Sequence, residues 1–251
     1  MTTYLPYVDD DDEPAAMRLF CFHHAGGAAS TFTGWQDELG PQINVLPVQL
    51  PGRERRVAEP RFTDMGALVA DLDRNLDPLL HAPYALYGHS MGAAVAYNLA
   101  LFRAARGSSL PVRLMVGAYP PPDVPAPIDK ALELSDDQLT QWLVGIGGMS
   151  EWILRYPDWV RAALALLRDD LRVCRSRPGL DRTAPECPTL PCPIDVFAGA
   201  EDPLLPVATA AGWDRHSSVG CSVHTMPGGH FFIEESAAVF LPTLAAALHS
   251  L

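Results

Sequence analysis

Ser90 lies in the pentapeptide GHSMG, between an apolar run typical of a strand and an alanine-rich run typical of a helix. A sharp strand-to-helix turn strains the backbone at the serine, and glycines two positions before and after it let the chain pass. The following helix then begins beneath the serine, and its free N–H groups face developing negative charge. The pattern predicts that Ser90 is a nucleophile and not an idle residue in a glycine-rich turn.

A serine hydroxyl needs a base, and the base needs an acid that orients it. Asp202, in GAEDPL, follows the strand-like run 193–199, and His230, in MPGGHFFIEE, follows the run 221–226. Both are expected at the carboxyl ends of parallel strands, on the same sheet edge as Ser90. The chain order Ser, Asp, His is also typical of this kind of site. We therefore predict a catalytic triad of these three residues, with Glu201 as an exposed loop charge.

The loop after the first strand-like run reads HHAGGAAS and has few bulky side chains. We expect the backbone N–H of Ala25 to converge with that of Met91 on one oxygen, which would form an oxyanion hole. Gly26 is the alternative donor and an expected substrate contact. Small residues also permit a tight loop, and the two interpretations are compatible.

Short β-rich runs alternate with longer helical patterns, which is typical of parallel strands joined by crossover helices. The sequence predicts an α/β fold, a doubly wound and mostly parallel sheet. The expected strands are 17–22, 43–50, 84–88, 112–118, 193–199 and 221–226, and the expected core helices begin near Asp64, at Met91, after Pro206 and near Ser236.

A helical block without strands interrupts this alternation. Ser135 is a plausible N-cap, and residues 157–175 continue the helical pattern. We expect residues 121–190 to form a lid inserted into a core of residues 17–120 and 191–251, because an active crevice lies at the carboxyl ends of the strands. Residues 1–16, with their acidic run, are expected to be a disordered tail.

The chain has 251 residues and a net charge of −12, which disfavours nucleic acid and anionic membrane as partners. No apolar stretch reaches the roughly 18 residues of a membrane span, and no signal peptide is evident, so we expect a cytoplasmic protein. The five cysteines form no CxxC pair and predict neither a zinc site nor a disulfide framework. An exposed apolar helix or a heptad pattern is not evident, so a monomer is expected.

Several blocks together resemble the type II thioesterases, which are free-standing partners of polyketide and nonribosomal peptide synthases with the α/β-hydrolase fold. The blocks are HHAGGAASTFTGW, VQLPGRERR, YGHSMGAAVAY, LSDDQLTQWLVGIGGMSEWIL, LLRDDLRV, GAEDPL and MPGGHFFIEE, and they cover about residues 17–248. In one departure, His23 stands where the family usually has a proline before His-Ala-Gly-Gly. This departure bears on the stiffness of the loop and not on its backbone donors.

The resemblance implies hydrolysis of acyl thioesters on the phosphopantetheine arm of acyl and peptidyl carrier proteins, which removes stalled or aberrant acyl groups. It also implies the triad and the two oxyanion donors at the positions given above, with no metal or organic cofactor. Trp142 and Met149 of the lid could line an acyl site, although lid packing is the more ordinary role. Because carrier proteins are usually acidic, a local basic patch is expected, for which the sequence offers Arg53, Arg55 and Arg56.

Three alternatives remain open at this level. A carboxylesterase or lipase would use the same triad on the same fold, because the chemistry does not choose between oxoester and thioester. A chain-releasing thioesterase is closer still. A non-catalytic binding protein with this fold would not need all three triad residues.

Overall fold

The computed structural model describes residues 2–7, 16–81, 83–177 and 188–250. Within these residues six strands form one sheet, in the order β2-β1-β3-β4-β5-β6, and each neighbouring pair runs parallel. The strands are β1 (Met17–Phe22), β2 (Ile43–Val48), β3 (Tyr84–His89), β4 (Arg113–Gly117), β5 (Ile194–Gly199) and β6 (Cys221–Met226). The predicted parallel sheet is confirmed, and β2 ends at Val48, two residues earlier than expected, because the N–H of Gln49 donates to the carbonyl of Tyr4 (2.8 Å) and not to a neighbouring strand.

The strand order reverses between β1 and β3. The chain passes from β1 outward to β2 and then returns to β3 on the other side of β1. The loops that follow β1 and β3 therefore leave the carboxyl edge of the sheet in different directions, which is where ligands of such sheets usually bind. Ala25 and Ser90 lie on these two loops.

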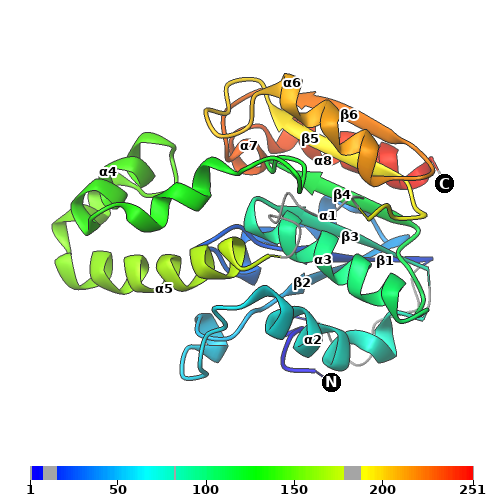
Figure 1. Ribbon diagram of the computed structural model, residues 1–251, viewed down its shortest axis with the longest axis horizontal. Coiled ribbons are helices and arrows are strands. Elements are labelled where there is room, and N and C mark those ends of the chain that lie inside the picture. Colours follow the sequence, from blue (N-terminus) through cyan, green and yellow to red (C-terminus); the bar gives the residue numbers. More distant parts are fainter. Residues whose placement is uncertain (1, 8–15, 82, 178–187, 251) are drawn as a thin grey trace.

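Helices cover both faces of the sheet (Figure 1). The helix α2 and the helix α3 share one apolar core with α5, while α1 and α8 pack on the opposite face. The α-helices are α1 (Trp35–Leu39), α2 (Met65–Leu76), α3 (Met91–Ala105), α4 (Asp136–Gly145), α5 (Pro157–Arg175), α6 (Val207–Ala210), α7 (Phe232–Glu235) and α8 (Ala237–His249). Short 3-10 helices are η1 (Ala29–Phe32), η2 (Glu54–Arg56), η3 (Asp77–Leu79), η4 (Pro127–Glu133), η5 (Glu151–Arg155) and η6 (Ala211–His216).

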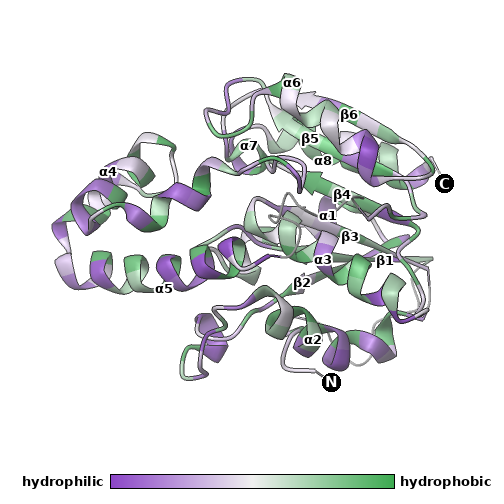
Figure 2. Ribbon diagram, viewed as in Figure 1, coloured by the Kyte–Doolittle hydropathy of each residue, from purple (hydrophilic) through white to green (hydrophobic). Residues whose placement is uncertain are grey.

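Local sequence explains where these elements begin. The Asp64 carboxylate accepts a hydrogen bond from the N–H of Ala67 (2.8 Å) and caps α2, while Ser135 and Gln138 form a reciprocal capping box at α4. The inner strands β1, β3, β4 and β5 are mostly apolar, as expected of buried parallel strands, whereas the edge strand β6 carries Ser222, His224 and Thr225 and is largely not buried (Figure 2). Side chains alternate between the two cores, so that Phe20 and Phe22 face one core and Leu19 and Cys21 the other.

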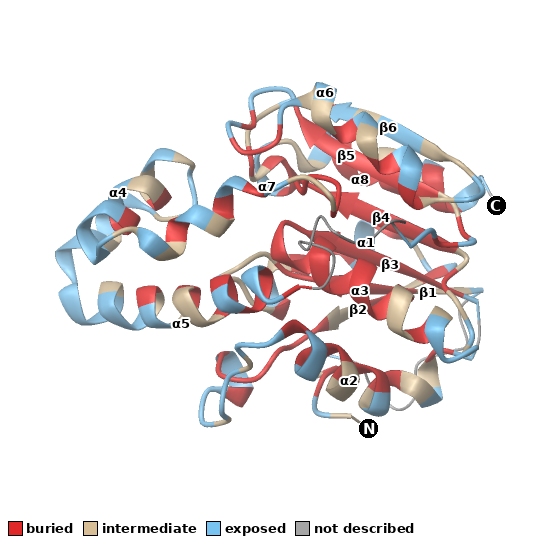
Figure 3. Ribbon diagram, viewed as in Figure 1, coloured by how far each residue is buried: buried red, intermediate tan, exposed pale blue. Residues whose placement is uncertain are grey.

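The chain that leaves the end of β4 runs into α4 and returns through α5 toward the sheet (Figure 1). The two helices project from the carboxyl edge of the strands, and the part farthest from the sheet is largely exposed (Figure 3). The lid role of these helices stays a prediction. The exact lid boundaries at 121 and 190 stay a prediction.

The N-terminal segment differs from the expected disordered tail. Tyr4 and Leu5 are buried in the core, where the Tyr4 hydroxyl donates to Asp71 (2.6 Å) and the Tyr4 carbonyl accepts from the N–H of Gln49 (2.8 Å). Two apolar side chains that precede the acidic run thus anchor residues 2–7. The prediction was wrong for this part, and the acidic run 9–13 lies outside the described residues.

Candidate active site

Ser90 occupies the sharp turn between β3 and α3. Its backbone has φ of 53° and ψ of −117°, a conformation that is strained for a residue with a side chain. A Cβ atom at Gly88 would lie 2.1 Å from the carbonyl oxygen of Gly92, and one at Gly92 would lie 2.0 Å from the carbonyl oxygen of Phe22. The two glycines therefore let α3 start directly against the end of β1.

His230 lies between the other two residues of the predicted triad. The Ser90 hydroxyl donates to His230 Nε2 (3.1 Å), and His230 Nδ1 donates to Asp202 Oδ2 (2.9 Å). All three side chains are buried, with 3% of Ser90, 3% of His230 and 6% of Asp202 exposed. Residues separated by up to 140 positions thus form one chain of hydrogen bonds that is shielded from water. The serine donates and the histidine accepts, as proton transfer from the serine requires.

The loops that carry the acid and the base are tied together at the end of β5. A Cβ atom at Gly199 would lie 2.2 Å from the carbonyl oxygen of Gly229, so the close approach of the two loops requires glycine there. The N–H of Glu201 donates to the carbonyl of Gly228 (2.9 Å). The second oxygen of the Asp202 carboxylate accepts from the N–H of Leu204 (2.7 Å), which holds the carboxylate toward His230.

The backbone N–H groups of Ala25 and Met91 are available to an oxyanion. Within the described chain, neither has an acceptor in the protein. The N–H of Gly26 is different, because it donates to Asp170 Oδ2 (2.8 Å). Gly26 is therefore not the alternative oxyanion donor, and this corrects the sequence prediction. Its Cα stays a predicted substrate contact.

His89 supports the loop of the base from below. Its pKa is well below the usual value because of burial and of the nearby His230, so the ring is neutral. Nε2 must then donate to the carbonyl of His230 (2.8 Å), and Nδ1 accepts from the hydroxyl of Tyr87 (3.1 Å). The neutral ring holds the backbone at His230 in place.

His24 also lies next to the triad. Burial lowers its pKa, and its Nδ1 donates to the carbonyl of Ala25 (3.0 Å). The ring packs edge-on against Phe231, with the two centroids 5.0 Å apart. Phe231 in turn lies under the lid, where a Cβ atom at Gly148 would be 3.2 Å from its ring. The absence of a side chain at Gly148 thus lets the segment after α4 pack closely against Phe231.

A small cavity of about 10 Å³, which is room for roughly one water molecule, lies next to Ser90 and His230. The segment after β4 and the loop after β5 form its apolar wall, which consists of Ala118, Tyr119, Pro120, Ala126, Pro127, Ile128 and Leu204. Trp142 and Met149 do not line this cavity; they are partly buried and pack against the core. The cavity therefore does not support the predicted acyl-site role of these two residues.

Two of the three arginines predicted for partner docking are buried. Arg53 is 6% exposed and its guanidinium is bound by Asp170, while Arg56 is 8% exposed and is bound by Glu59 (2.6 Å). Neither can offer its charge to a partner at the surface, so the prediction was wrong for both. Arg55 is exposed, and its role stays a prediction.

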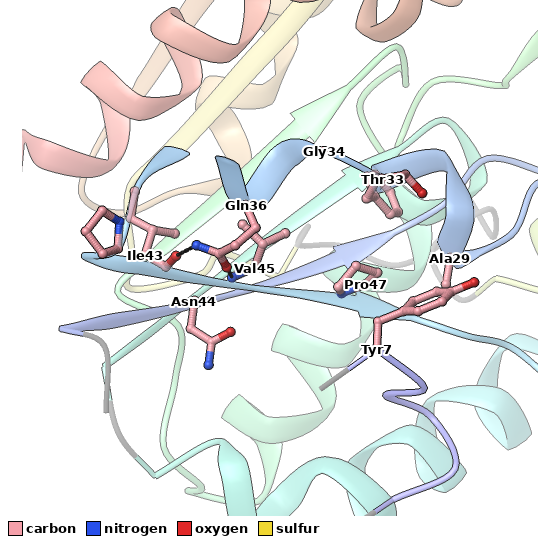
Figure 4. A pocket seen from close by; sticks show the side chains of 11 residues that line it. Tyr7, Ala29, Thr33, Gly34, Gln36, Ile43, Asn44, Val45 and Pro47 are labelled. Atoms are coloured by element: carbon pink, nitrogen blue, oxygen red, sulfur yellow. Dashed lines mark hydrogen bonds between the residues drawn. The ribbon is translucent and has the colours of Figure 1, made fainter. Parts of the chain in front are cut away.

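A larger cavity of about 550 Å³ lies elsewhere, along the edge strand β2 (Figure 4). Gln36 is one of the residues that line it, and its side chain is hydrogen-bonded to the β2 backbone. It accepts from the N–H of Val45 (2.9 Å) and donates to the carbonyl of Ile43 (3.0 Å). No titratable residue except Tyr7 lines this cavity. It offers no group for acyl transfer.

Asp170, which contacts both Arg53 and the loop after β1, is not among the site residues predicted from the sequence. A signal was present: Asp170 falls on the apolar face of its helix, three residues after Leu167 and four before Cys174, both of which are buried. A carboxylate on an apolar helix face predicts a buried partner.

Within the described residues no cluster of three or more His, Cys, Asp or Glu side chains could hold a metal ion. No described helix is both long and apolar enough to cross a membrane.

Comparisons with known proteins agree with this geometry. Residues 17–250 match the family model described as "Thioesterase domain". The gramicidin S biosynthesis protein GrsT of Aneurinibacillus migulanus is 34% identical over 88% of this chain and 85% of its own. RedJ, a thioesterase from the prodiginine pathway of Streptomyces coelicolor, is 33% identical, with a TM-score of 0.83 over 94% of this chain and 88% of RedJ. The type II thioesterase BorB of the borrelidin cluster is 34% identical, with a TM-score of 0.79 over 93% of each chain. The chain belongs to the thioesterase family and has the α/β-hydrolase fold.

Proposed function

We propose that this protein hydrolyses acyl thioesters held on the phosphopantetheine arm of carrier proteins in polyketide or nonribosomal peptide biosynthesis, and so removes stalled or aberrant acyl groups. The observation that carries the proposal is the hydrogen-bonded series of Ser90, His230 and Asp202 in a chain of the thioesterase family. A relative named as a type II thioesterase, BorB, supports the free-standing role.

In the proposed mechanism, His230 takes the proton of Ser90 as the serine oxygen attacks the thioester carbonyl. Asp202 stabilises the imidazolium that forms, and the N–H groups of Ala25 and Met91 bind the oxyanion. His230 then returns the proton to the leaving sulfur, and the acyl group stays on Ser90. Water, deprotonated by the same histidine, releases the acid and restores the serine.

The volume of the cavity bears on the acyl group. About 10 Å³ is room for roughly one water molecule and is far below the roughly 300–1,000 Å³ of pockets that enclose drug-sized ligands. Within the described part of the chain, no lysine or arginine lines the cavity that could pair with a charged acyl end. We therefore expect short, uncharged acyl units to be removed fastest.

The test is removal of acyl groups from a carrier protein loaded with acetyl, propionyl or decanoyl units, followed by intact-mass measurement. We expect turnover of all carrier-bound thioesters that fit, with acetyl and propionyl ahead of decanoyl. Matched oxoesters form the control. Faster hydrolysis of the oxoester would favour a general esterase, and absence of turnover with any ester would favour a binding protein.

Arg55 remains the candidate for contact with an acidic carrier. It lies on the loop after β2, on the same sheet edge as Ser90, and its side chain is exposed beside Tyr7. We expect Arg55→Glu to raise KM for a carrier-bound substrate by about 3- to 10-fold, because a rim charge acts mainly on encounter. KM for a small thioester that lacks the carrier should not change.

The matched control for Arg55 is Arg74→Glu. Arg74 is exposed near the end of α2, which lies at the opposite edge of the sheet, and it pairs with Asp71 (2.8 Å). This reversal should leave both KM values unchanged. An equal rise for both variants would instead indicate a general effect of net charge. A carrier KM that is unchanged in Arg55→Glu would remove Arg55 from the docking surface.

The monomeric state and the cytoplasmic location stay predictions.

A further inference from the structure

Asp170 links the lid helix α5 to the loop that follows β1. Its Oδ2 accepts from Arg53 Nη1 (2.8 Å) and its Oδ1 accepts from Arg53 Nη2 (2.8 Å), which makes a bidentate pair. Both side chains are almost fully buried, with 2% of Asp170 and 5% of Arg53 exposed. The pair therefore has a rigid geometry and little screening by water.

The same carboxylate reaches the loop that carries the proposed oxyanion donor. Oδ2 of Asp170 also accepts from the N–H of Gly26 (2.8 Å), and Arg53 Nη1 donates to the carbonyl of Gly27 (3.2 Å). On the other side, the carbonyl of Ala25 accepts from His24 Nδ1 (3.0 Å). The peptide group between Ala25 and Gly26 is thus held at its C=O and at its N–H.

A peptide group held at both ends cannot rotate. Gly26 has φ of 77°, in the left-handed region that glycine adopts readily, at the third position of a turn closed by the bond from the N–H of Gly27 to the carbonyl of His24 (3.0 Å). The free N–H of Ala25 belongs to the adjacent peptide and shares the Ala25 Cα with the held one. The His24 carbonyl of that adjacent peptide accepts from His23 Nδ1 (2.8 Å) and from the N–H of Gly27 (3.0 Å). The contacts of Asp170 and of the His24 ring add a restraint through the neighbouring peptide.

We propose that Asp170, oriented by Arg53, is a positioning residue for the oxyanion hole, so that the docked position of the lid helix sets the aim of the Ala25 N–H. This inference rests on the proposed function. Misplacement of a reacting group by about 1 Å costs on the order of 100-fold in rate, so a weak local change is amplified in catalysis.

The neighbouring pair Arg61–Asp169 provides the internal comparison. It joins the same helix to the segment before α2 (2.7 Å), and its side chains are 32% and 16% exposed. Asp169 contacts Arg61 and Arg172 and no residue of the loop after β1. A general role of lid ion pairs would make the two aspartates equivalent, whereas the proposal makes them different.

The main test is the double variant Arg53→Met, Asp170→Leu. Removal of one buried partner leaves an uncompensated charge, but replacement of both by apolar residues of similar volume is often neutral for stability. The double variant therefore removes the acceptor of the Gly26 N–H without the cost of a lone buried charge. Asp169→Asn is the matched control, and thermal melting reports on folding.

The measurements distinguish a misdirected oxyanion donor from loss of folding and from loss of substrate binding. We measure kcat and KM for propionyl-N-acetylcysteamine, and the inhibition constant of a short alkyl trifluoromethyl ketone, which adds to serine and places an oxyanion in the hole. In the double variant kcat should fall about 10- to 100-fold and the inhibition constant should rise by a similar factor, while KM changes less than about 3-fold. Asp169→Asn should match the wild type in all three.

A folded double variant with wild-type kcat and ketone affinity would overturn the inference, and so would an equal loss in Asp169→Asn. A fall in kcat without weaker ketone binding would also overturn it. If the double variant does not fold, Asp170→Asn decides by the same measures. It keeps a carbonyl oxygen for Gly26 and loses the charge, so a smaller parallel loss in both values is expected. A wild-type protein that hydrolyses no thioester, with no ketone binding, would mark failure of the proposed function instead.

Discussion

Substitution of Ser90 by alanine is expected to lower kcat for thioester hydrolysis by about 10⁵- to 10⁶-fold, because no other group can form the acyl intermediate. The fold should persist. The backbone bonds of the turn, from the N–H of Ser90 to the carbonyl of Gly117 (2.8 Å) and from the N–H of Ala93 to the carbonyl of Ser90 (2.9 Å), do not involve the side chain. Steady-state kinetics and thermal melting measure the two effects.

Covalent labelling provides a second, independent readout for Ser90. A fluorophosphonate probe should form one adduct on the wild-type protein, and peptide mapping should place it on Ser90. The alanine variant should stay unlabelled at the same probe concentration. Retained hydrolysis in this variant, or an adduct at another serine, would refute the assignment of the nucleophile.

The variant Asp202→Asn should lower kcat by about 10³- to 10⁴-fold with little change in stability. Asparagine can donate to His230 Nδ1, and this bond favours the tautomer with the proton on Nε2. That nitrogen faces the Ser90 hydroxyl at 3.1 Å and must be free to take its proton. The bond from the N–H of Leu204 to Oδ1 can be retained by the amide oxygen, so the loop after β5 should keep its shape.

Glu201→Gln is the matched control for Asp202→Asn. Glu201 is the adjacent carboxylate, but its side chain is exposed. The kcat of this variant should stay within about 2-fold of the wild type, in line with a surface substitution. Equal losses for the two variants would mean that the effect comes from the charge of the loop and not from the tautomer of His230.

Local sequence was sufficient for most of the fold. The amphipathic pattern of residues 157–175 predicted α5 with both bounds correct, and the cap at Ser135 predicted the start of α4. These signals are local because apolar periodicity and capping act within one or two turns. Local signals do not predict the order of residues 2–7. Tyr4 and Leu5 lack such a pattern, and only their packing against the core orders them.

The arginines show a second limit. The sequence PGRERR offers three similar charges, yet Arg53 and Arg56 are buried while Arg55 is exposed. Which of them is buried depends on partners distant in the chain, such as Asp170, 117 residues beyond Arg53. The composition of a loop does not contain this information.

By itself, the sequence determined the turn at Ser90 and the order of serine, acid and base, because the glycines and strand ends that place them are local features. Only the tertiary structure decided which backbone donors stay free. The N–H of Gly26 and that of Ala25 are one residue apart and chemically alike, but a carboxylate from the lid helix takes the first and leaves the second. A hydrogen bond between segments distant in the chain arises from packing, and packing sums contacts that no short stretch of sequence records.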